Sequence, residues 1–216
     1  MIQKRETLTK KERSAEKAFF ANLNIKKRTT KTPLVVALIG LVGSGKTSVA
    51  QELAKHIGAT IVSSDIIRIE LRKQKERYEN ARTIAENAAI KVIESGGNAI
   101  LDSDFIDRHK RASLRLRFRA TNVHPVFIRI HCNIDAQITR MLAEFCDDHT
   151  SEFLRPEVKI REMWRRTPLH YRSTNQRGGI WALKKLPFTV SAEINTTHSD
   201  AWKKEVEKIA QRFLDA

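Results

Sequence analysis

The residues between positions 40 and 47 have the types and the spacing of a phosphate-binding loop. They read Gly-Leu-Val-Gly-Ser-Gly-Lys-Thr and match the pattern G-x-x-x-x-G-K-[ST]. Glycines let the backbone fold tightly with its N–H groups pointing inward, where these donors and the positive end of the next helix can bind phosphate oxygens. In this pattern Lys46 neutralises the β- and γ-phosphate oxygens, and the Thr47 hydroxyl joins the coordination shell of Mg²⁺. The motif therefore predicts a site for ATP, or another nucleoside triphosphate (NTP), with Mg²⁺.

The residues on either side of this loop support the prediction. A continuous apolar run at 34–39 precedes it, as expected of a strand buried on both faces, and a predicted helix near 46–56 follows it. A glycine-rich turn without a ligand is the alternative, but the strand and the helix stand in the arrangement that the motif requires. The residues expected to contact the nucleotide are Gly40, Gly43, Ser44, Gly45, Lys46, Thr47 and Ser48.

The end of another predicted strand, at 98–101, bears on the fate of the γ-phosphate. Asp102 follows this strand directly and can hold Mg²⁺ itself or through water. A motor or transporter ATPase usually has Glu next, to activate water, whereas this chain has Ser103. The chain also lacks the Asn-Lys-x-Asp run by which GTPases recognise guanine. These features disfavour a GTPase and ATP hydrolysis for mechanical work, and they favour transfer of the phosphate to another acceptor.

A second acidic residue, Asp65, follows the predicted strand at 60–63, just before a helix. Ligands of open α/β sheets bind outside the carboxyl ends of the strands, so Asp65 lies where it could accept the proton of an acceptor hydroxyl. Arg68 is three residues further on the same helix face and could bind an anionic group of the acceptor. The alternative is that Asp65 caps the helix and Arg68 is a surface charge. The phosphate loop upstream favours the catalytic interpretation.

Three segments together resemble a known family: Gly-Leu-Val-Gly-Ser-Gly-Lys-Thr-Ser (40–48), Ser-Ser-Asp-Ile-Ile-Arg (63–68) and Ile-Leu-Asp-Ser-Asp-Phe (100–105). They are similar to motifs of the small P-loop kinases that include polynucleotide 5′-hydroxyl kinases and zeta toxins. The resemblance implies that Asp65 is the general base and that Arg68 contacts an acceptor phosphate. We also expect Asp104, in the third segment, to belong to the acceptor site. It also implies an α/β P-loop NTPase fold: a three-layer sandwich with a five-stranded, mainly parallel sheet in the order 2-3-1-4-5, and a helical lid that carries arginines.

The lid arginines are expected within residues 140–180, where the resemblance is weakest. Family members often carry two arginines one turn apart after strand 4; Arg140 fits the first, but Glu144 stands where the second would be. Arg161 and Arg165 are also four residues apart, in a predicted helical stretch, and we favour them as the catalytic lid pair. A solvated basic helix is the alternative for this stretch.

The rest of the sequence alternates strand patterns with helix patterns. Further strands are predicted at 126–130 and within 188–194, and further helices near 65–76, 79–95, 108–121, 134–146 and 200–214. This alternation implies parallel strands in one sheet with helices on both faces. We therefore expect one P-loop domain over residues 32–216, preceded by a basic extension.

The charge of the chain favours anionic partners. Its 216 residues include 40 Lys and Arg against 25 Asp and Glu, a formal net charge of +15. Residues 1–31 are rich in Lys and Arg, and Thr9 followed by Glu12 predicts a capping box, with a short helix after it. We interpret this segment as a partly disordered, solvated extension, with a dedicated binding element as the alternative.

Three further features bear on partners and location. Arg111, Arg115 and Arg119 repeat every four residues, as either a solvated helix face or a track for a phosphate backbone would. The sequence has no apolar run of the roughly 18–20 residues that a membrane span needs, and no apolar stretch typical of a secretory signal. The two cysteines, Cys132 and Cys146, lack metal-binding spacing, so we expect idle thiols and a cytoplasmic protein.

Three functions fit these patterns. The first is an ATP- and Mg²⁺-dependent kinase that moves the γ-phosphate to a hydroxyl of an anionic acceptor, with the 5′ end of RNA or DNA as the expected acceptor. The second is a small-molecule or nucleotide kinase, whose acidic acceptor would need Arg68 but not the basic extension. The third, of a different class, is an NTP-binding switch or nucleic-acid-binding module with little turnover.

Overall fold

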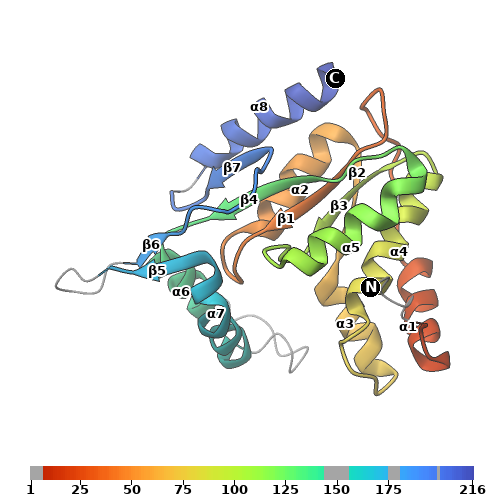
Figure 1. Cartoon of the computed structure of the whole chain (residues 1–216), viewed down its shortest axis with the longest axis horizontal. Helices are drawn as coiled ribbons and strands as arrows, with labels where there is room; N and C mark the ends of the chain where they lie inside the picture. The colour runs from red at the N-terminus through yellow and green to blue at the C-terminus, as the bar shows by residue number, and fades with distance from the viewer. Residues whose placement is uncertain (1–6, 144–155, 175–180, 199) are drawn as a thin grey trace.

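A five-stranded sheet forms the centre of the computed structural model, which describes residues 7–143, 156–174, 181–198 and 200–216. All neighbouring strands of this sheet are parallel, in the order β2-β3-β1-β4-β7 (Figure 1). The strands are β1 (Val35–Ile39), β2 (Ala59–Ser63), β3 (Asn98–Asp102), β4 (Val126–His131) and β7 (Ala192–Asn195). The predicted strands and their order 2-3-1-4-5 are confirmed, with β7 as the fifth strand of the sheet.

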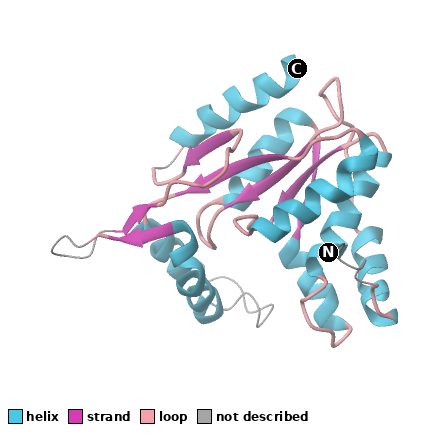
Figure 2. Cartoon of the chain, viewed as in Figure 1, coloured by secondary structure: helices cyan, strands magenta, loops and turns pink. Residues whose placement is uncertain are grey.

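Helices cover both faces of the sheet, which explains the continuous apolar run in β1 (Figure 2). Val36 and Leu38 pack with α2 and α8 on one face, while Val35, Ala37 and Ile39 pack with α1, α3, α4 and α5 on the other. The helices are α1 (Lys10–Ala21), α2 (Lys46–Ile57), α3 (Ser64–Lys73), α4 (Ala81–Glu94), α5 (Arg108–Phe118) and α8 (Ala201–Asp215). The predicted three-layer α/β sandwich is therefore confirmed.

A smaller unit lies beyond the carboxyl ends of β1 and β4 (Figure 1). It consists of α6 (Ile134–Ala143), α7 (Pro156–His170) and an antiparallel hairpin of β5 (Tyr171–Ser173) and β6 (Trp181–Leu183). The hairpin was not predicted, because strands of three residues are too short to show an alternating pattern. Apolar side chains of this unit pack against Leu41 and thereby hold it next to the phosphate loop. Glu144 and Cys146 lie outside the described residues.

The amino-terminal segment is part of the folded core from residue 8 onward. Thr9 and Glu12 form the predicted capping box at the start of α1. One face of α1 is apolar, and its Ala15 and Phe19 are buried in the core cluster that includes residues of α3 and α4. Glu12 also accepts a hydrogen bond from Asn80 at 2.8 Å. This packing differs from our interpretation of the segment as a solvated extension, which gave weight to its charge and too little to its apolar stripe.

The residues between α1 and β1 are fixed to the amino-terminal edge of the sheet. The Thr29 amide donates to the Ile57 carbonyl, and the buried Asn98 side chain bonds with Thr30. Gly58 lets this segment pass closely, because a Cβ there would lie 2.3 Å from the Lys27 carbonyl oxygen. Removing residues 1–31 would therefore remove core and edge contacts of the domain together with the basic charges.

The arginine stripe that begins on α5 is structural in part. Arg111 is buried, donates to the carbonyls of Phe105 and Ile106, and has its guanidinium 3.5 Å from the centroid of the Phe188 ring. The Arg115 guanidinium lies 4.9 Å from the Phe127 ring centroid. Cation–π contacts of this kind stabilise the packing of α5 on the sheet. The solvated-face interpretation is wrong for the buried Arg111, because spacing alone does not show which side of a helix faces the core, whereas Arg115 and Arg119 are exposed.

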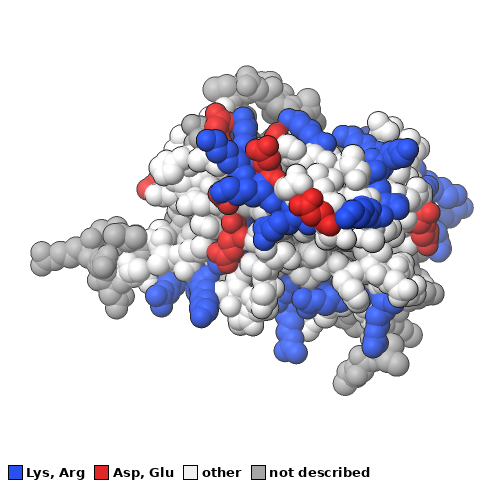
Figure 3. Space-filling view, turned by 90° about the horizontal axis from the view of Figure 1, so that it is seen from above, with Lys and Arg blue, Asp and Glu red and all other residues white. Residues whose placement is uncertain are grey.

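Three further properties concern the charges of one face, the length of the helices and the thiol of Cys132. Basic side chains on the face that carries α8 are interspersed with acidic and uncharged ones instead of forming one continuous patch (Figure 3). None of the helices in the described part of the chain is long and apolar enough to span a membrane. Cys132 is a free, buried thiol, and burial raises its pKa.

Candidate active site

The phosphate loop has the backbone geometry that its sequence predicts. Gly45, directly before α2, has a φ of +85°, a left-handed conformation that glycine adopts without strain. A Cβ at Gly40 would lie 2.4 Å from the Ile130 carbonyl oxygen, so only glycine fits between the loop and β4. The loop is thus a tight turn that ends at the positive amino terminus of α2.

Two polar side chains of the loop fit a bound triphosphate. The Lys46 ammonium lies within the loop and donates to the Leu41 carbonyl at 2.7 Å. The Ser44 hydroxyl is buried and has no hydrogen-bond partner among the described residues. A buried hydroxyl without a partner costs free energy, so its presence inside a phosphate-binding turn fits a ligand that supplies the missing bond.

Thr47 and Asp102 lie together at the predicted metal position. The Thr47 hydroxyl donates to the Asp102 carboxylate at 2.8 Å. Burial raises the pKa of Asp102, and the nearby Lys46 and the bond from Thr47 act in the opposite direction. A hydroxyl and a carboxylate are hard oxygen donors, which suit Mg²⁺ when nucleotide phosphates supply further ligands. This pair could therefore hold the metal of a Mg²⁺–NTP complex.

One cavity of about 730 Å³ joins the phosphate loop to the ends of β2 and β3. Its volume is typical of small-ligand sites. The predicted residues that line it are Gly40, Gly43, Gly45, Lys46, Thr47, Ser48, Asp65, Arg68, Asp102 and Asp104. Segments far apart in sequence thus contribute polar side chains to a single cavity at the carboxyl edge of the sheet, as expected for a doubly covered parallel sheet.

Asp65 and Arg68 form an ion pair in this cavity. The Arg68 guanidinium lies 2.9 Å from the Asp65 carboxylate, one turn away on α3. Ser63, not Asp65, occupies the capping position of α3, so helix capping does not explain the carboxylate. Both side chains are partly exposed to the cavity, where an acceptor can reach them.

Asp104 has a structural environment that its sequence position did not reveal. Its side chain is only 12% exposed and pairs with Arg166 of α7 at 2.6 Å, while His170 of the same helix lies 3.1 Å away. The amide of Gly40, the first residue of the phosphate loop, donates to its other oxygen at 3.2 Å. Burial raises the pKa of Asp104, but His170, Arg166 and Lys46 lower it more, so the net pKa is well below its usual range. Asp104 therefore links the phosphate loop to α7.

The structure places the two predicted lid arginines outside the cavity. Arg161 and Arg165 are exposed, and Arg165 pairs with Glu162 of its own helix at 2.7 Å. The face of α7 that points inward carries Met163 and Thr167, and Arg161 and Arg165 lie on the opposite face of the helix. The four-residue spacing placed Arg161 and Arg165 on one face of the helix, but it did not show whether that face points toward the cavity.

Arg140 and Arg166 line the cavity in their place. Arg140 of α6 donates to the hydroxyl of Thr196 at 3.2 Å and to its carbonyl, and the Thr196 hydroxyl donates to the Ser44 carbonyl. Arg140 is therefore attached to the phosphate loop through one intermediate residue. The spacing typical of the family had suggested Arg140 as a lid arginine. Thr196, His170 and Arg166 belong to no sequence motif, so the sequence alone could not identify their roles.

Solved structures with similar folds include three kinases. A gluconokinase from Sinorhizobium meliloti 1021 aligns with a TM-score of 0.53 at 15% identity, over 85% of this chain and 94% of that chain. The APS kinase CysC of Mycobacterium tuberculosis, in complex with AMPPNP and APS, aligns with a TM-score of 0.54 at 15% identity, over 88% and 99%. A sugar kinase from Janibacter sp. HTCC2649 aligns with a TM-score of 0.51 at 15% identity, over 85% and 95%. Because the sequence identities are this low, the structural similarity establishes the fold alone.

The sequence comparisons place the chain in a family. No curated protein matches the sequence. The profile of the AAA domain family matches residues 35–143, which is half of the chain and contains the phosphate loop, Asp65 and Asp102. The chain belongs to the AAA domain family.

Proposed function

We propose that this protein is an ATP- and Mg²⁺-dependent kinase that transfers the γ-phosphate to a hydroxyl of a small, anionic acceptor. The observation that carries the proposal is the single cavity that contains both the phosphate loop and the Asp65–Arg68 pair. Phosphoryl transfer needs the two substrates side by side, with cations around the phosphate and a base at the attacking hydroxyl. A cavity of this composition meets that need.

Each residue has a role in this proposal that follows from its position. Lys46 and the loop amides bind the phosphates, and Asp65 accepts the proton of the acceptor hydroxyl. Arg68 binds an anionic group of the acceptor, and Arg140 and Arg166 stabilise the charge that develops on the transferred phosphoryl group. When bound at Thr47 and Asp102, Mg²⁺ neutralises phosphate charge.

A small acceptor has more support than a polynucleotide. Gluconokinase and APS kinase, whose folds are similar, are named for small acceptors. The basic features that favoured a polynucleotide have structural contacts here: α1 packs in the core, and Arg111 is buried against Phe188.

A transfer assay with Lys46→Ala tests the proposal. Wild-type protein with radiolabelled γ-phosphate ATP and Mg²⁺ is expected to label sugar acids or nucleotides in preference to neutral sugars and oligonucleotides. Loss of a preorganised cation at the developing charge lowers kcat by about 10²–10³-fold. Wild-type protein that binds ATP but labels no acceptor would be an NTP-binding module, and Lys46→Ala with full transfer would contradict the role of the loop.

The lid arginines can be distinguished by a matched pair of variants. Arg140→Ala is expected to lower kcat/KM by about 10–100-fold, because a charged hydrogen bond contributes roughly 1.5–3 kcal/mol. Arg161→Ala removes the same charge from the outer face of α7 and should stay within about threefold of wild type. Steady-state kinetics with ATP varied measures both. If both variants lose the same factor in kcat/KM, Arg161 also acts as a lid arginine.

A further inference from the structure

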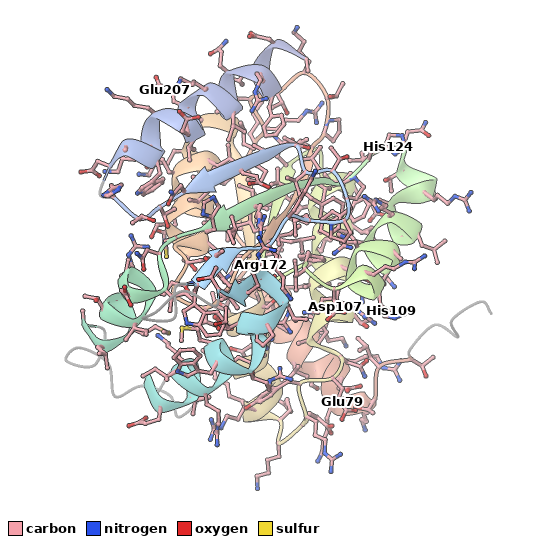
Figure 4. All side chains as sticks on the ribbon, turned by 60° about the vertical axis from the view of Figure 1, so that its left-hand side comes forward. Glu79, Asp107, His109, His124, Arg172 and Glu207 are labelled. Carbon is pink, nitrogen blue, oxygen red and sulfur yellow. The ribbon has the colours of Figure 1, made fainter. Side chains whose placement is uncertain are left out.

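Lys110 is a cation of the cavity wall that the proposed function does not use. It lies in the first turn of α5, directly after His109. Figure 4 labels His109 and Asp107 at the start of this helix. Its side chain is half-buried and lines the cavity together with Asp65, Arg68 and Asp104. Lysine side chains usually extend their ammonium group to water, so an ammonium kept at a cavity wall needs an explanation.

Two acids that line the cavity with Lys110 are already paired with other cations. Asp65 pairs with Arg68 at 2.9 Å, and Asp104 pairs with Arg166 at 2.6 Å. In the described part of the chain no carboxylate lies within 4.0 Å of the Lys110 ammonium. Its hydrogen bond goes to a neutral group, the Asp104 carbonyl, at 3.1 Å. One carbonyl leaves two of the three ammonium protons for another partner.

The electrostatics of this corner of the cavity favour an anion. Burial lowers the pKa of Lys110, Arg166 lowers it further, and Arg68 adds to the effect, while Asp104 and Asp107 oppose it. Lys110, Arg68 and Arg166 thus line one cavity and repel one another. An anionic ligand relieves this repulsion and forms charge-assisted hydrogen bonds with the ammonium.

We propose that Lys110 recognises the acceptor by binding a carboxylate or phosphate group on it. The inference rests on the proposed function, and it names the residue that selects the anionic group of the acceptor. Arg68 and Lys110 then hold the acceptor from two different elements, α3 and α5, in the cavity that Asp65 lines. The selectivity for anionic over neutral acceptors resides mainly in Lys110, because the charge of Arg68 is already offset by Asp65.

A binding experiment tests this site independently of turnover. The full-length protein is saturated with AMPPNP and Mg²⁺, so that the phosphate loop is filled, and inorganic sulfate is titrated by calorimetry. Lys110→Met is expected to weaken sulfate binding about 10–100-fold, which corresponds to the loss of a charged hydrogen bond. Lys110→Arg keeps the charge and should retain most of the affinity. Arg108→Met removes an exposed cation from the same helix turn, outside the cavity, and should bind as wild type does.

The outcomes of the titration are decisive. Wild-type protein that binds no sulfate, or Lys110→Met that binds it as tightly as wild type, overturns the proposal. If Lys110→Met alone loses sulfate and yet wild-type protein phosphorylates no acceptor, the anion site stands and the kinase function fails. If transfer occurs and sulfate affinity is unchanged in Lys110→Met, the kinase function stands and the role of Lys110 fails.

An acceptor series identifies the anionic group. Gluconate, glucose 6-phosphate and glucose are similar polyols that carry a carboxylate, a phosphate and no charge. The wild type is expected to prefer one of the two anions, and Lys110→Met should raise the KM for that anion about tenfold or more while leaving kcat and the activity with glucose nearly unchanged. A preference for glucose in the wild type, or an equal loss with all three acceptors, would contradict recognition through Lys110.

Discussion

Replacing Asp65 with Asn is expected to lower kcat about 10²–10⁴-fold, the usual contribution of a general base. Asn keeps the size of the side chain and one acceptor oxygen but cannot accept the hydroxyl proton. Nucleotide affinity should be unchanged, because the loop residues that bind the phosphates lie on α2 and the preceding turn. Stability should change little as well, since the partly exposed Asp65–Arg68 pair contributes about 0–1 kcal/mol.

Single-turnover transfer and nucleotide titration together measure the effect of Asp65→Asn. Asp135→Asn is a matched control, because Asp135 also stands in the first turn of a helix after a sheet strand but is exposed outside the cavity. The control should transfer phosphate as wild type does. If Asp65→Asn keeps kcat within about threefold of wild type, another group accepts the proton, and the assignment of Asp65 is wrong.

The parts of the fold that were predicted correctly are those that a local pattern determines. β1 is apolar throughout because both faces of its sheet are covered, and that run is visible in the sequence. The phosphate loop is a local turn whose glycines and Lys46 follow one another in the chain. Asp65 follows β2 and Asp102 ends β3, and the carboxyl ends of parallel strands lie at one edge of a sheet. The proximity of Asp65 and Asp102 therefore follows from the parallel topology of the sheet.

The parts that were missed depend on which way a helix faces. Arg165 and Arg166 are neighbours in sequence, yet one is 67% exposed and the other lies against Asp104. The inward direction of α7 is set by tertiary packing of Met163, which no spacing of charged residues shows. The same cause misled the interpretation of Arg111, which is buried against Phe188. Charge patterns on amphipathic helices therefore predicted the presence of basic faces but not their partners.

Replacing Asp104 with Asn is expected to destabilise the protein by roughly 3–5 kcal/mol at neutral pH, because removal of one partner leaves Arg166, which is only 14% exposed, without its counter-charge. The Asn side chain can still accept a bond from the Gly40 amide, so the loss comes mainly from the charge. Urea unfolding followed by circular dichroism measures the difference. Adding Arg166→Met to Asp104→Asn removes the uncompensated cation and should recover part of the lost stability.

The pH dependence of this loss follows from the lowered pKa of Asp104. Asp104 is surrounded by His170, Arg166 and Lys46, which hold its folded-state pKa below that of an unfolded Asp, about 3.9. A depressed pKa contributes stability that is complete above the unfolded pKa and is lost as the pH falls through the folded pKa. The difference between wild type and Asp104→Asn should therefore be large and nearly constant from about pH 5 to 8 and should shrink below about pH 4. A difference that stays constant down to about pH 2, or that is absent at pH 7, would mean that the Asp104 charge does not join α7 to the phosphate loop.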